Sequence, residues 1–318
     1  MTRDSQRRRG VARDTTGQPP TTSARKPAPA AQPDSSGAAL TREFRFSYRD
    51  FQRIQKLIYE RVGISLSDAK QDMVYSRLSR RLRARGLTSF SDYLDLLVGD
   101  DQVEWEAFTN ALTTNLTSFF REEHHFPVLA EHAVKRGRGQ PYSVWCCASS
   151  TGEEPYSIAM TLADAFGSLT PPVTILATDV DTQVLKTAQE GVYPVDRVEK
   201  LGPDRMRRYF LRGTGPQSGF ARVRPELRSL ITFRRVNLLE SNWSVRAPFD
   251  ALFCRNVMIY FDKETQTSML RRFAPLLKPD GLLFMGHSES LFHVADTFRL
   301  RGKTVYELMP KSHVRGRE

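Results

Sequence analysis

The chain has 318 residues, three cysteines and a formal net charge of +11. This length is enough for two domains of about 150 residues each. No run of about 18 apolar residues occurs, which argues against a membrane-spanning helix, and the N-terminus lacks the apolar block of a secretory signal. The cysteines form neither a zinc pattern nor a disulfide framework. We therefore expect a cytoplasmic protein whose cysteines pack in the core.

The positive charge would suit nucleic acid, a membrane surface or an acidic protein partner. Part of it lies in residues 1–40, which carry seven basic and three acidic side chains and no aromatic residue. Such a segment cannot bury enough apolar surface to fold. We predict a disordered tail over residues 1–40 and a second, short tail over residues 311–318.

Residues 41–113 are predicted to form a small all-helical domain. Apolar side chains recur there at helical spacing, and Gly63 ends the first of these patterns. The predicted helices cover residues 51–62, 68–85, 93–97 and 105–112. A linker over residues 114–140 follows.

Residues 141–310 are predicted to form an α/β domain with a Rossmann-like parallel sheet. Four apolar strands, YSVWCCA, VTILATD, FDALFCRN and GLLFMGHS, alternate with the helical segments PYSIAMTLADAF, DTQVLKTAQEG and KETQTSMLRRFAPLLK. This order is typical of a sheet with helices on both faces. Two β-rich runs at about residues 210–236 predict a small antiparallel β insertion. The segment FRLRGKTVYEL predicts a closing hairpin that turns at RGK.

The first strand leads into an unusual loop within WCCASSTGEEPYSIAM, residues 145–160. The N-terminus of a helix attracts anions, yet Glu153 and Glu154 already bring two carboxylates there. They would repel a pyrophosphate by roughly a few kcal/mol if unscreened. The loop therefore indicates a ligand that presents an ammonium group.

Other polar residues stand at the ends of later strands, where ligands of such sheets bind. Asp179 lies 25 residues after Glu154, where a carboxylate commonly binds ribose hydroxyls. Asn237 follows the insertion, and Arg255 with Asn256 ends the next core strand. S-adenosylmethionine, which has a ribose, a base and a cationic amino-acid head, satisfies this set. First-turn acids and a helix cap at Asp179 explain the loop equally well.

Four further stretches are long and distinctive. They are DMVYSRLSRRLRARGL, LTTNLTSFFREEHHF, RYFLRGTGPQSGFARVRPEL, and PFDALFCRNVMIYFDKETQ leading into LLKPDGLLFMGHSES. Together with the loop at residues 145–160, they resemble the CheR family of chemotaxis receptor glutamate O-methyltransferases. The resemblance covers about residues 44–309. It implies a small helical domain followed by an S-adenosylmethionine-dependent methyltransferase domain with a β insertion, in agreement with the predicted elements.

The resemblance also implies a role for each residue that matches a family motif. Arg121 and Tyr260 would lie at the methyl-transfer site and position the reacting carboxylate. Glu154 would bind the methionine amino group, and Asp179 the ribose. The implied cofactor-binding set is Asn115, Thr117, Arg121, Glu154, Asp179, Asn237, Leu238, Arg255 and Asn256.

The implied reaction converts receptor glutamates to methyl esters, with S-adenosylhomocysteine as the second product, for sensory adaptation. The pKa of a glutamate is ordinarily about 4.3, so the nucleophile is already ionised and needs no general base. Because opposite charges neutralise each other during transfer, a site that excludes water favours the reaction. Holding the reactants in line contributes up to about 7 to 11 kcal/mol.

A receptor-docking role is implied for the second predicted helix. Arg77, Arg80 and Arg83 lie opposite its apolar stripe, and on sequence alone a solvated face is the simpler interpretation. The resemblance implies instead that this face docks on the acidic cytoplasmic helices of a chemoreceptor. We expect a cytoplasmic monomer that is recruited to membrane receptor arrays without inserting into the membrane or binding nucleic acid.

A second receptor contact is implied by RGTGP, residues 212–216. Family members that bind a peptide tether at the receptor C-terminus carry such a loop, and the tether would add a strand to the insertion. Arg212 and Arg222 are the candidate contacts. A simple turn is the alternative.

Two other functions compete with this interpretation. One is a methyltransferase of the same fold that acts on RNA or on another protein. An RNA substrate would also explain the charge, but the arginine face lacks the interleaved aromatic residues that RNA stacking requires. A non-catalytic module that senses S-adenosylmethionine would not need Arg121 and Tyr260. No metal site is predicted, because adjacent His124 and His125 would point about 100° apart on a helix.

Overall fold

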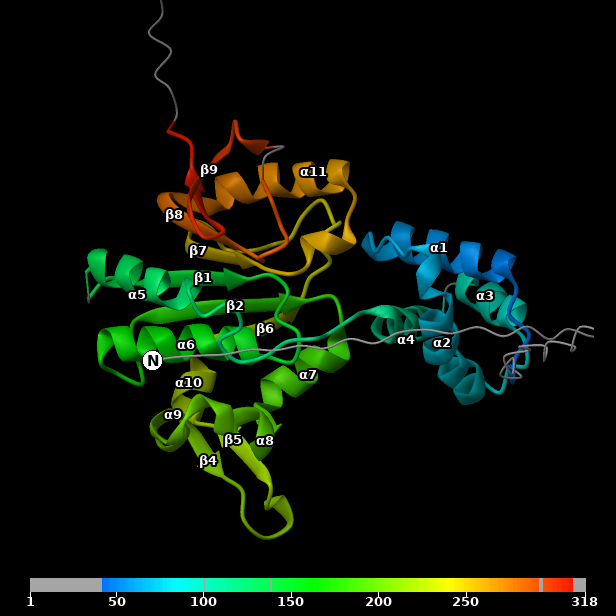
Figure 1. The fold of residues 1–318 in the computed structure, drawn as a ribbon, viewed down its shortest axis with the longest axis horizontal. Coiled ribbons are helices and arrows are strands. Elements are labelled where there is room, and N and C mark those ends of the chain that lie inside the picture. Colours follow the sequence, from blue (N-terminus) through cyan, green and yellow to red (C-terminus); the bar gives the residue numbers. More distant parts are fainter. Residues whose placement is uncertain (1–41, 100, 138, 292–293, 311–318) are drawn as a thin grey trace, which may run out of the picture. The chain divides into compact units, whose positions relative to one another are not determined.

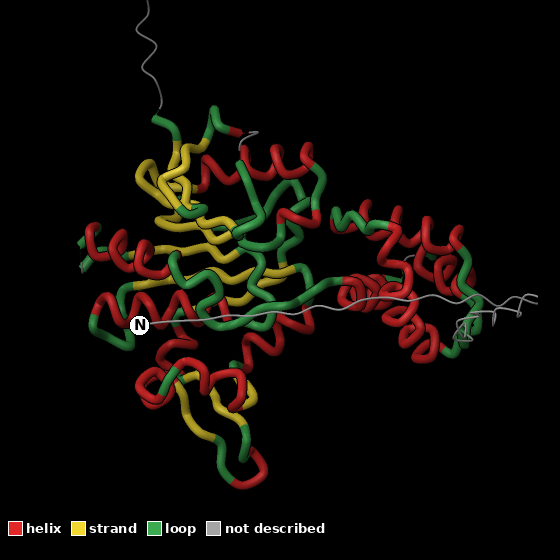
Figure 2. Tube along the Cα trace, in the orientation of Figure 1, coloured by secondary structure: helices red, strands yellow, loops and turns green. Residues whose placement is uncertain are grey.

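The structure, a computed structural model, describes residues 42–99, 101–137, 139–291 and 294–310. The predicted tails over residues 1–40 and 311–318 lie outside the described residues. The elements described between residue 48 and residue 112 are all helices, and the strands follow (Figure 2). No helix in the described ranges combines the length and the apolar character needed to cross a bilayer.

The predicted helical domain is confirmed. Its elements are α1 (Tyr48–Val62), the 3-10 helix η1 (Asp68–Lys70), α2 (Gln71–Arg85), α3 (Phe90–Val98) and α4 (Gln102–Leu112). The apolar stripes of the four α-helices meet in one core. Gly63 ends α1 with a φ of 74°, which a residue with a Cβ rarely adopts.

Three of these helices begin three residues earlier than the apolar spacing predicts. In each, a side chain just before the helix accepts a hydrogen bond from a backbone N–H of the first turn. These capping residues are Ser47, Ser89 and Asp101. In α1 and α4 the capped first turn buries no apolar residue, so periodicity does not reveal it. In α3 the buried Phe90 belongs to the apolar stripe, and the predicted start was too late.

Seven strands form the main sheet in the order β6-β2-β1-β7-β8-β10-β9. They are β1 (Tyr142–Cys146), β2 (Val173–Asp179), β6 (Ile231–Arg235), β7 (Phe249–Cys254), β8 (Leu277–Met285), β9 (Phe298–Gly302) and β10 (Val305–Leu308). The first five in this spatial order are parallel, while β10 runs antiparallel to β8 and β9. The strand order reverses between β1 and β7, which is where ligands bind to such sheets.

Side chains alternate between two cores on opposite faces of the sheet. Val144 and Cys146 of β1 share one core with α5 (His125–Lys135) and α6 (Glu153–Phe166). Trp145 shares the other core with α11 (Lys263–Phe273). Figure 1 shows these helices on either side of the strands. The two-residue period of a strand accounts for this separation, and it confirms the predicted sheet with helices on both faces.

The β insertion is a separate antiparallel sheet in the order β3-β5-β4, and it lies below the main sheet in Figure 1. Its strands are β3 (Val192–Pro194), β4 (Phe210–Arg212) and β5 (Phe220–Val223), connected through α8 (Val195–Val198), η2 (Glu199–Leu201), α9 (Pro203–Tyr209) and η3 (Gly215–Gln217).

The predicted bounds of the insertion, about residues 210–236, were wrong at both ends. The insertion begins at β3, and the second predicted run is β6, which follows α10 (Pro225–Ser229) and pairs in parallel with β2. The reason is that β6 is an edge strand. Its polar residues resemble those of a half-exposed antiparallel strand.

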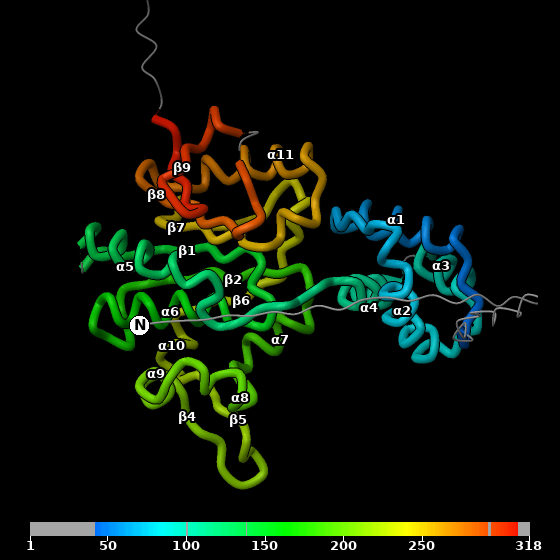
Figure 3. The backbone as a smooth tube through the Cα atoms, viewed as in Figure 1, coloured from blue at the N-terminus to red at the C-terminus, as the bar shows by residue number. Residues whose placement is uncertain are grey.

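The predicted linker, residues 114–140, also needs correction, because it contains α5. This helix packs against α6 and belongs to the α/β domain. Only the segment from residue 113 to residue 124 connects the two domains as a loop, which can be followed in Figure 3. The remaining elements are α7 (Thr182–Glu190), η4 (Met258–Tyr260) and η5 (Ala274–Leu276).

Candidate active site

A cavity of about 550 Å³ lies at the carboxyl ends of β1, β2 and β7 and beside the segment that follows β6. The helical domain contributes one wall, from Val62 to Met73, and the connecting segment contributes another. Tyr260 and all nine residues predicted to bind the cofactor line this cavity. The nine are Asn115, Thr117, Arg121, Glu154, Asp179, Asn237, Leu238, Arg255 and Asn256.

The loop after β1 separates its two neighbouring carboxylates. Gly152 has a φ of 100°, and a Cβ there would lie 2.7 Å from the hydroxyl of Tyr193, so only glycine fits. Glu153 is fully buried and forms an ion pair of 2.8 Å with Arg197. Of the two carboxylates, Glu154 therefore lines the cavity while Glu153 binds a side chain that follows β3. The sequence alone left this distinction open.

Arg255 connects Glu154 to the segment between the domains. Its guanidinium is almost fully buried and donates from Nη1 to Oε2 of Glu154 and from Nη2 to the carbonyl of Arg121, each at 2.5 Å. A second contact of Glu154 comes from the Cys146 thiol, 3.3 Å from Oε1. Arg255 thus sets the orientation of Glu154 in addition to lining the cavity.

Asp179 ends β2 and is held by backbone groups. Its carboxylate accepts hydrogen bonds from the N–H groups of Ser150 at 2.8 Å and Asp181 at 3.0 Å. Only 9% of the residue is exposed, and this burial raises the pKa of Asp179 to about 6.

Asp181 fixes the connecting segment and was not predicted. It caps the N-terminus of α7 and accepts hydrogen bonds from the Thr113 hydroxyl at 2.6 Å and the Asn115 amide at 2.8 Å. The pattern TDVDT contained the signal, since a second Asp that immediately precedes a helix is a favourable N-cap. Its bonds to the connecting segment depend on tertiary structure.

Several contacts join the helical domain to the α/β domain beside the cavity. The Asn237 amide donates to the carbonyl of Arg61 at 2.9 Å, and the Tyr59 hydroxyl donates to Asp262 at 2.5 Å. The backbone N–H of Ser65 donates to the carbonyl of Tyr260 at 2.9 Å. The amide of Asn237, predicted as a cofactor contact, therefore also joins the two domains.

The two residues predicted to position the acceptor approach the cavity from different segments. Arg121 is half-buried and donates to the carbonyl of Leu116 at 3.0 Å. The Tyr260 hydroxyl is 3.5 Å from the carbonyl of Thr114. Phe120 and Glu122, on either side of Arg121, have φ values of 52° and 55°, a strained conformation for such residues.

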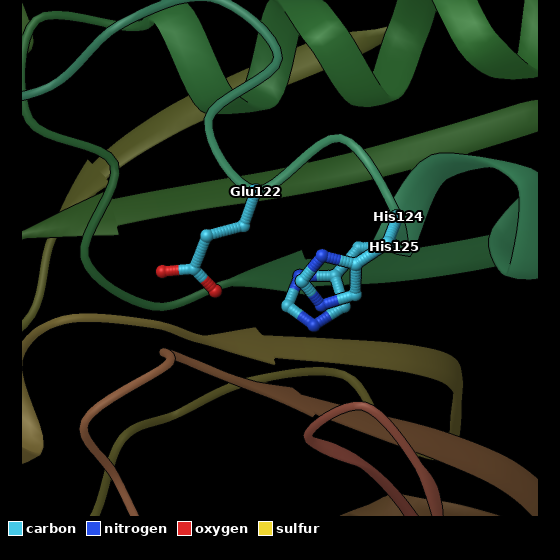
Figure 4. Close-up of side chains that lie close together, drawn as sticks. All are labelled: Glu122, His124 and His125. Atoms are coloured by element: carbon cyan, nitrogen blue, oxygen red, sulfur yellow. The ribbon is translucent and has the colours of Figure 1, made fainter. Parts of the chain in front are cut away.

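Glu122, His124 and His125 form a cluster beside the cavity, where one possible ligand atom of each lies within 4.8 Å of the others (Figure 4). The expected divergence of the two histidines is wrong: their ring centroids are 4.2 Å apart. The reason is that His124 precedes α5 and only His125 belongs to that helix.

Hydrogen bonds satisfy part of this cluster, while Oε2 of Glu122 and Nδ1 of His125 are buried without a hydrogen-bond partner among the described residues. Nε2 of both rings faces the carbonyl of Lys303, at 3.0 Å for His124 and 3.2 Å for His125. Glu122 accepts from the Asn256 amide at 3.3 Å and lies 3.6 Å from the Arg255 guanidinium. Burial, together with that guanidinium, lowers the pKa of His125 to about 3, so its ring is neutral.

The three arginines predicted on the docking helix differ in their surroundings. Arg77 is half-buried and donates to the carbonyls of residues 111, 112 and 113, at 3.3, 3.3 and 2.6 Å, so it caps the end of α4. Arg83 pairs with Glu43. Arg80 is exposed and forms no ion pair with another described residue.

Arg212 and Arg222 lie on neighbouring strands of the insertion, β4 and β5, and both line a hollow of about 350 Å³. In the described part of this sheet β4 pairs only with β5, so its other edge is open. Leu211 on β4 and Phe220 on β5 are 42% and 40% exposed there.

Comparison with known proteins gives one consistent result. Residues 49–113 match the family described as CheR methyltransferase, all-alpha domain, and residues 115–307 match CheR methyltransferase, SAM binding domain. A chemotaxis protein methyltransferase of Salmonella typhimurium is 57% identical over 270 residues, which are 85% of this chain and 93% of that protein. One of Escherichia coli is 56% identical over 270 residues, 85% of this chain and 94% of that protein.

Among solved structures, a TehB-like SAM-dependent methyltransferase of Corynebacterium glutamicum is 12% identical, with a TM-score of 0.33. The match covers 57% of this chain and 84% of that one.

Proposed function

The chain belongs to the CheR methyltransferase family, and we propose that it methylates glutamate side-chain carboxylates of chemoreceptors for sensory adaptation in chemotaxis. The methyl donor is S-adenosylmethionine, and the products are glutamate methyl esters and S-adenosylhomocysteine. One observation supports this most directly: the carboxylates of Glu154 and Asp179 line a single cavity at the ends of neighbouring strands. Two carboxylates suit an ammonium group and ribose hydroxyls and disfavour a pyrophosphate.

The residues that line the cavity fit this cofactor. We assign Glu154 to the ammonium group, where it would share its carboxylate with Arg255, and Asp179 to the ribose. We assign the contacts with the adenine to Asn237 and Leu238. We assign the remaining cofactor contacts to Asn115, Thr117, Arg121, Arg255 and Asn256.

The proposed reaction needs orientation and exclusion of water. Bound S-adenosylmethionine supplies an electrophilic methyl group on a sulfonium centre. Arg121 and Tyr260 each donate to a carbonyl of the connecting segment, and both donors would turn to the acceptor carboxylate when it enters. An ionised glutamate needs no base. Strong binding of that carboxylate by either donor would stabilise the ground state and slow transfer.

Receptor docking is assigned to the exposed side of α2. Arg80 is the best candidate there because its charge is not neutralised by a described partner, whereas Arg77 and Arg83 are already bonded within the domain. An acidic receptor helix would be attracted to Arg80 by a force that salt screens.

The open edge of β4 is the proposed site for a receptor peptide tether. An added strand would bind backbone groups of residues 210–212, with Arg212 and Arg222 beside it. The protein would act as a monomer that receptors recruit to their arrays.

The test is methyl transfer to purified cytoplasmic fragments of chemoreceptors from labelled S-adenosylmethionine. We expect label in the receptor that mild base releases as methanol, as for a methyl ester. Arg121→Ala should abolish this label. Label on RNA, or cofactor binding without transfer to any receptor fragment, would contradict the proposal.

A further inference from the structure

A buried carboxylate lies behind the cavity and has no role in the reaction proposed above. Glu289 follows β8, is 6% exposed and forms no ion pair with a described basic residue. Backbone groups surround it instead. Its Oε2 accepts from the N–H of Asn256 at 2.9 Å and of Gly286 at 2.5 Å, and its Oε1 accepts from the N–H of Met258 at 2.8 Å.

These donors belong to two loops, one after β7 and one after β8. Asn256 has a φ of 57°, which turns its N–H toward the shared carboxylate. Gly286 lies so close that a Cβ there would be 2.7 Å from both the backbone nitrogen of Asn256 and Oε2 of Glu289. Converging N–H groups of this kind form an anion site, and Glu289 fills it from within the chain.

The segment that Glu289 holds, residues 256–260, carries four residues that line the cavity, among them the predicted site residues Asn256 and Tyr260. Asn256 lines it and also donates to Glu122, while Tyr260 ends the 3-10 helix that begins at Met258. We propose that Glu289 is a positioning residue, whose carboxylate fixes residues 256–260 in the shape that presents Asn256 to the cofactor and Tyr260 to the acceptor. This inference rests on the proposed function for the identity of both ligands.

A carboxylate is the side chain that this geometry requires. It offers acceptor oxygens only, so it can accept all three N–H groups at once. Glutamine has the same shape, but its NH₂ group would face an N–H donor and leave that donor buried and unpaired. Glu289→Gln therefore alters the loop with little change in volume.

The test measures binding of S-adenosylhomocysteine by calorimetry, together with kcat and KM for receptor methylation. In Glu289→Gln we expect the Kd to rise about tenfold and kcat to fall at saturating cofactor, because Asn256 and Tyr260 are both displaced. Gly286→Ala should move both quantities in the same direction, since its Cβ would overlap Nδ2 of Asn256 and lie 2.7 Å from Oε2 of Glu289, and would displace both.

Asp250→Asn is the matched control. Asp250 is fully buried near the start of the same strand β7, accepts from the N–H of Ser143 at 2.8 Å and pairs with Lys278 at 2.8 Å. Its loss should lower Tm while leaving Kd and kcat of the folded protein within about twofold of their original values.

Three results would overturn the inference: unchanged Kd and kcat in folded Glu289→Gln, unchanged Kd and kcat in Gly286→Ala, or equal losses in Asp250→Asn. If Glu289→Gln does not fold, Glu289→Asp decides, since it keeps the carboxylate but withdraws it from the three N–H groups, and unchanged Kd and kcat in that variant would also overturn the inference. The proposed function can fail separately. If the unaltered protein binds S-adenosylhomocysteine but methylates no receptor, the proposed acceptor is wrong. The effect of Glu289→Gln on the Kd for S-adenosylhomocysteine then still tests the positioning role.

Discussion

At the scale of single residues, the sequence predicted which residues lie at the candidate site but not which way their side chains face. Loops at the ends of the predicted strands and after the insertion pointed to five residues, and the family resemblance added Asn115, Thr117, Arg121 and Leu238. All nine line one cavity. Which way a side chain faces depends on partners distant in sequence. Arg197, beyond β3, is the partner that draws Glu153 away from the cavity. Glu289 escaped prediction for the same reason, since its three donors come from two separate loops.

Glu153 and Glu154 provide a matched pair for testing this orientation. Glu154→Gln should weaken S-adenosylhomocysteine binding at least tenfold, because the ammonium group loses a charged partner. Glu153→Gln should change the Kd by less than about twofold. Its effect should be a loss of roughly 1 to 3 kcal/mol in the free energy of unfolding, since a buried acceptor is removed. Calorimetry and urea unfolding measure the two quantities, and equal affinity losses in both variants would contradict the assignment.

Asp179 predicts how cofactor binding depends on pH. Because burial raises its pKa to about 6, Asp179 takes up a proton as the pH falls through that value. In the protein without cofactor, protonation of Asp179 stabilises the fold, and this contribution to the free energy of unfolding is lost as the pH rises through about 6. Ribose hydroxyls need the ionised acceptor, so affinity for S-adenosylhomocysteine should fall up to about tenfold per unit below pH 6 and level off above it.

Asp179→Asn should bind more weakly at pH 7.5 and lose the dependence near pH 6. If the Kd depends on pH identically in Asp179→Asn and in the unaltered protein, a group other than Asp179 titrates near pH 6.

At the scale of elements, apolar periodicity predicted most helices and strands that have one buried face. The edge strand β6, in which Thr232 and Arg235 are exposed, was assigned to the insertion. Helix α5 has a buried face but was not predicted, because its segment was interpreted as a linker. The docking helix has the opposite difficulty. Its arginines form one pattern in sequence, but the fold uses Arg77 to cap α4.

This difference between arginines of one helix predicts separate phenotypes. Arg80→Glu should lower kcat/KM for receptor methylation several-fold at low salt, with a smaller effect at high salt because screening already weakens the attraction. S-adenosylhomocysteine binding should be unchanged. Arg77→Ala should instead lower Tm, since carbonyls at the end of α4 lose their donor. An Arg80→Glu variant that methylates receptors normally at every salt concentration would remove α2 as the docking surface.

At the scale of the whole molecule, the cavity depends on both domains, which the sequence could describe only one at a time. Residues of the helical domain form one of its walls, and the hydrogen bond from Tyr59 to Asp262 is one of the contacts that hold that wall against the α/β domain. Tyr59→Phe removes this contact alone, so the wall should open more often and S-adenosylhomocysteine affinity should fall roughly threefold.

Tyr48→Phe is its control, because the Tyr48 hydroxyl contacts Asp68 within the helical domain, at 3.4 Å. Loss of that contact should leave affinity unchanged. Protease cleavage between residues 113 and 124 should accelerate in Tyr59→Phe only, and bound S-adenosylhomocysteine should suppress the acceleration, because a ligand that contacts both domains favours their closed arrangement. Equal cleavage rates in the two variants would mean that the other contacts at this junction hold the cavity closed without Tyr59.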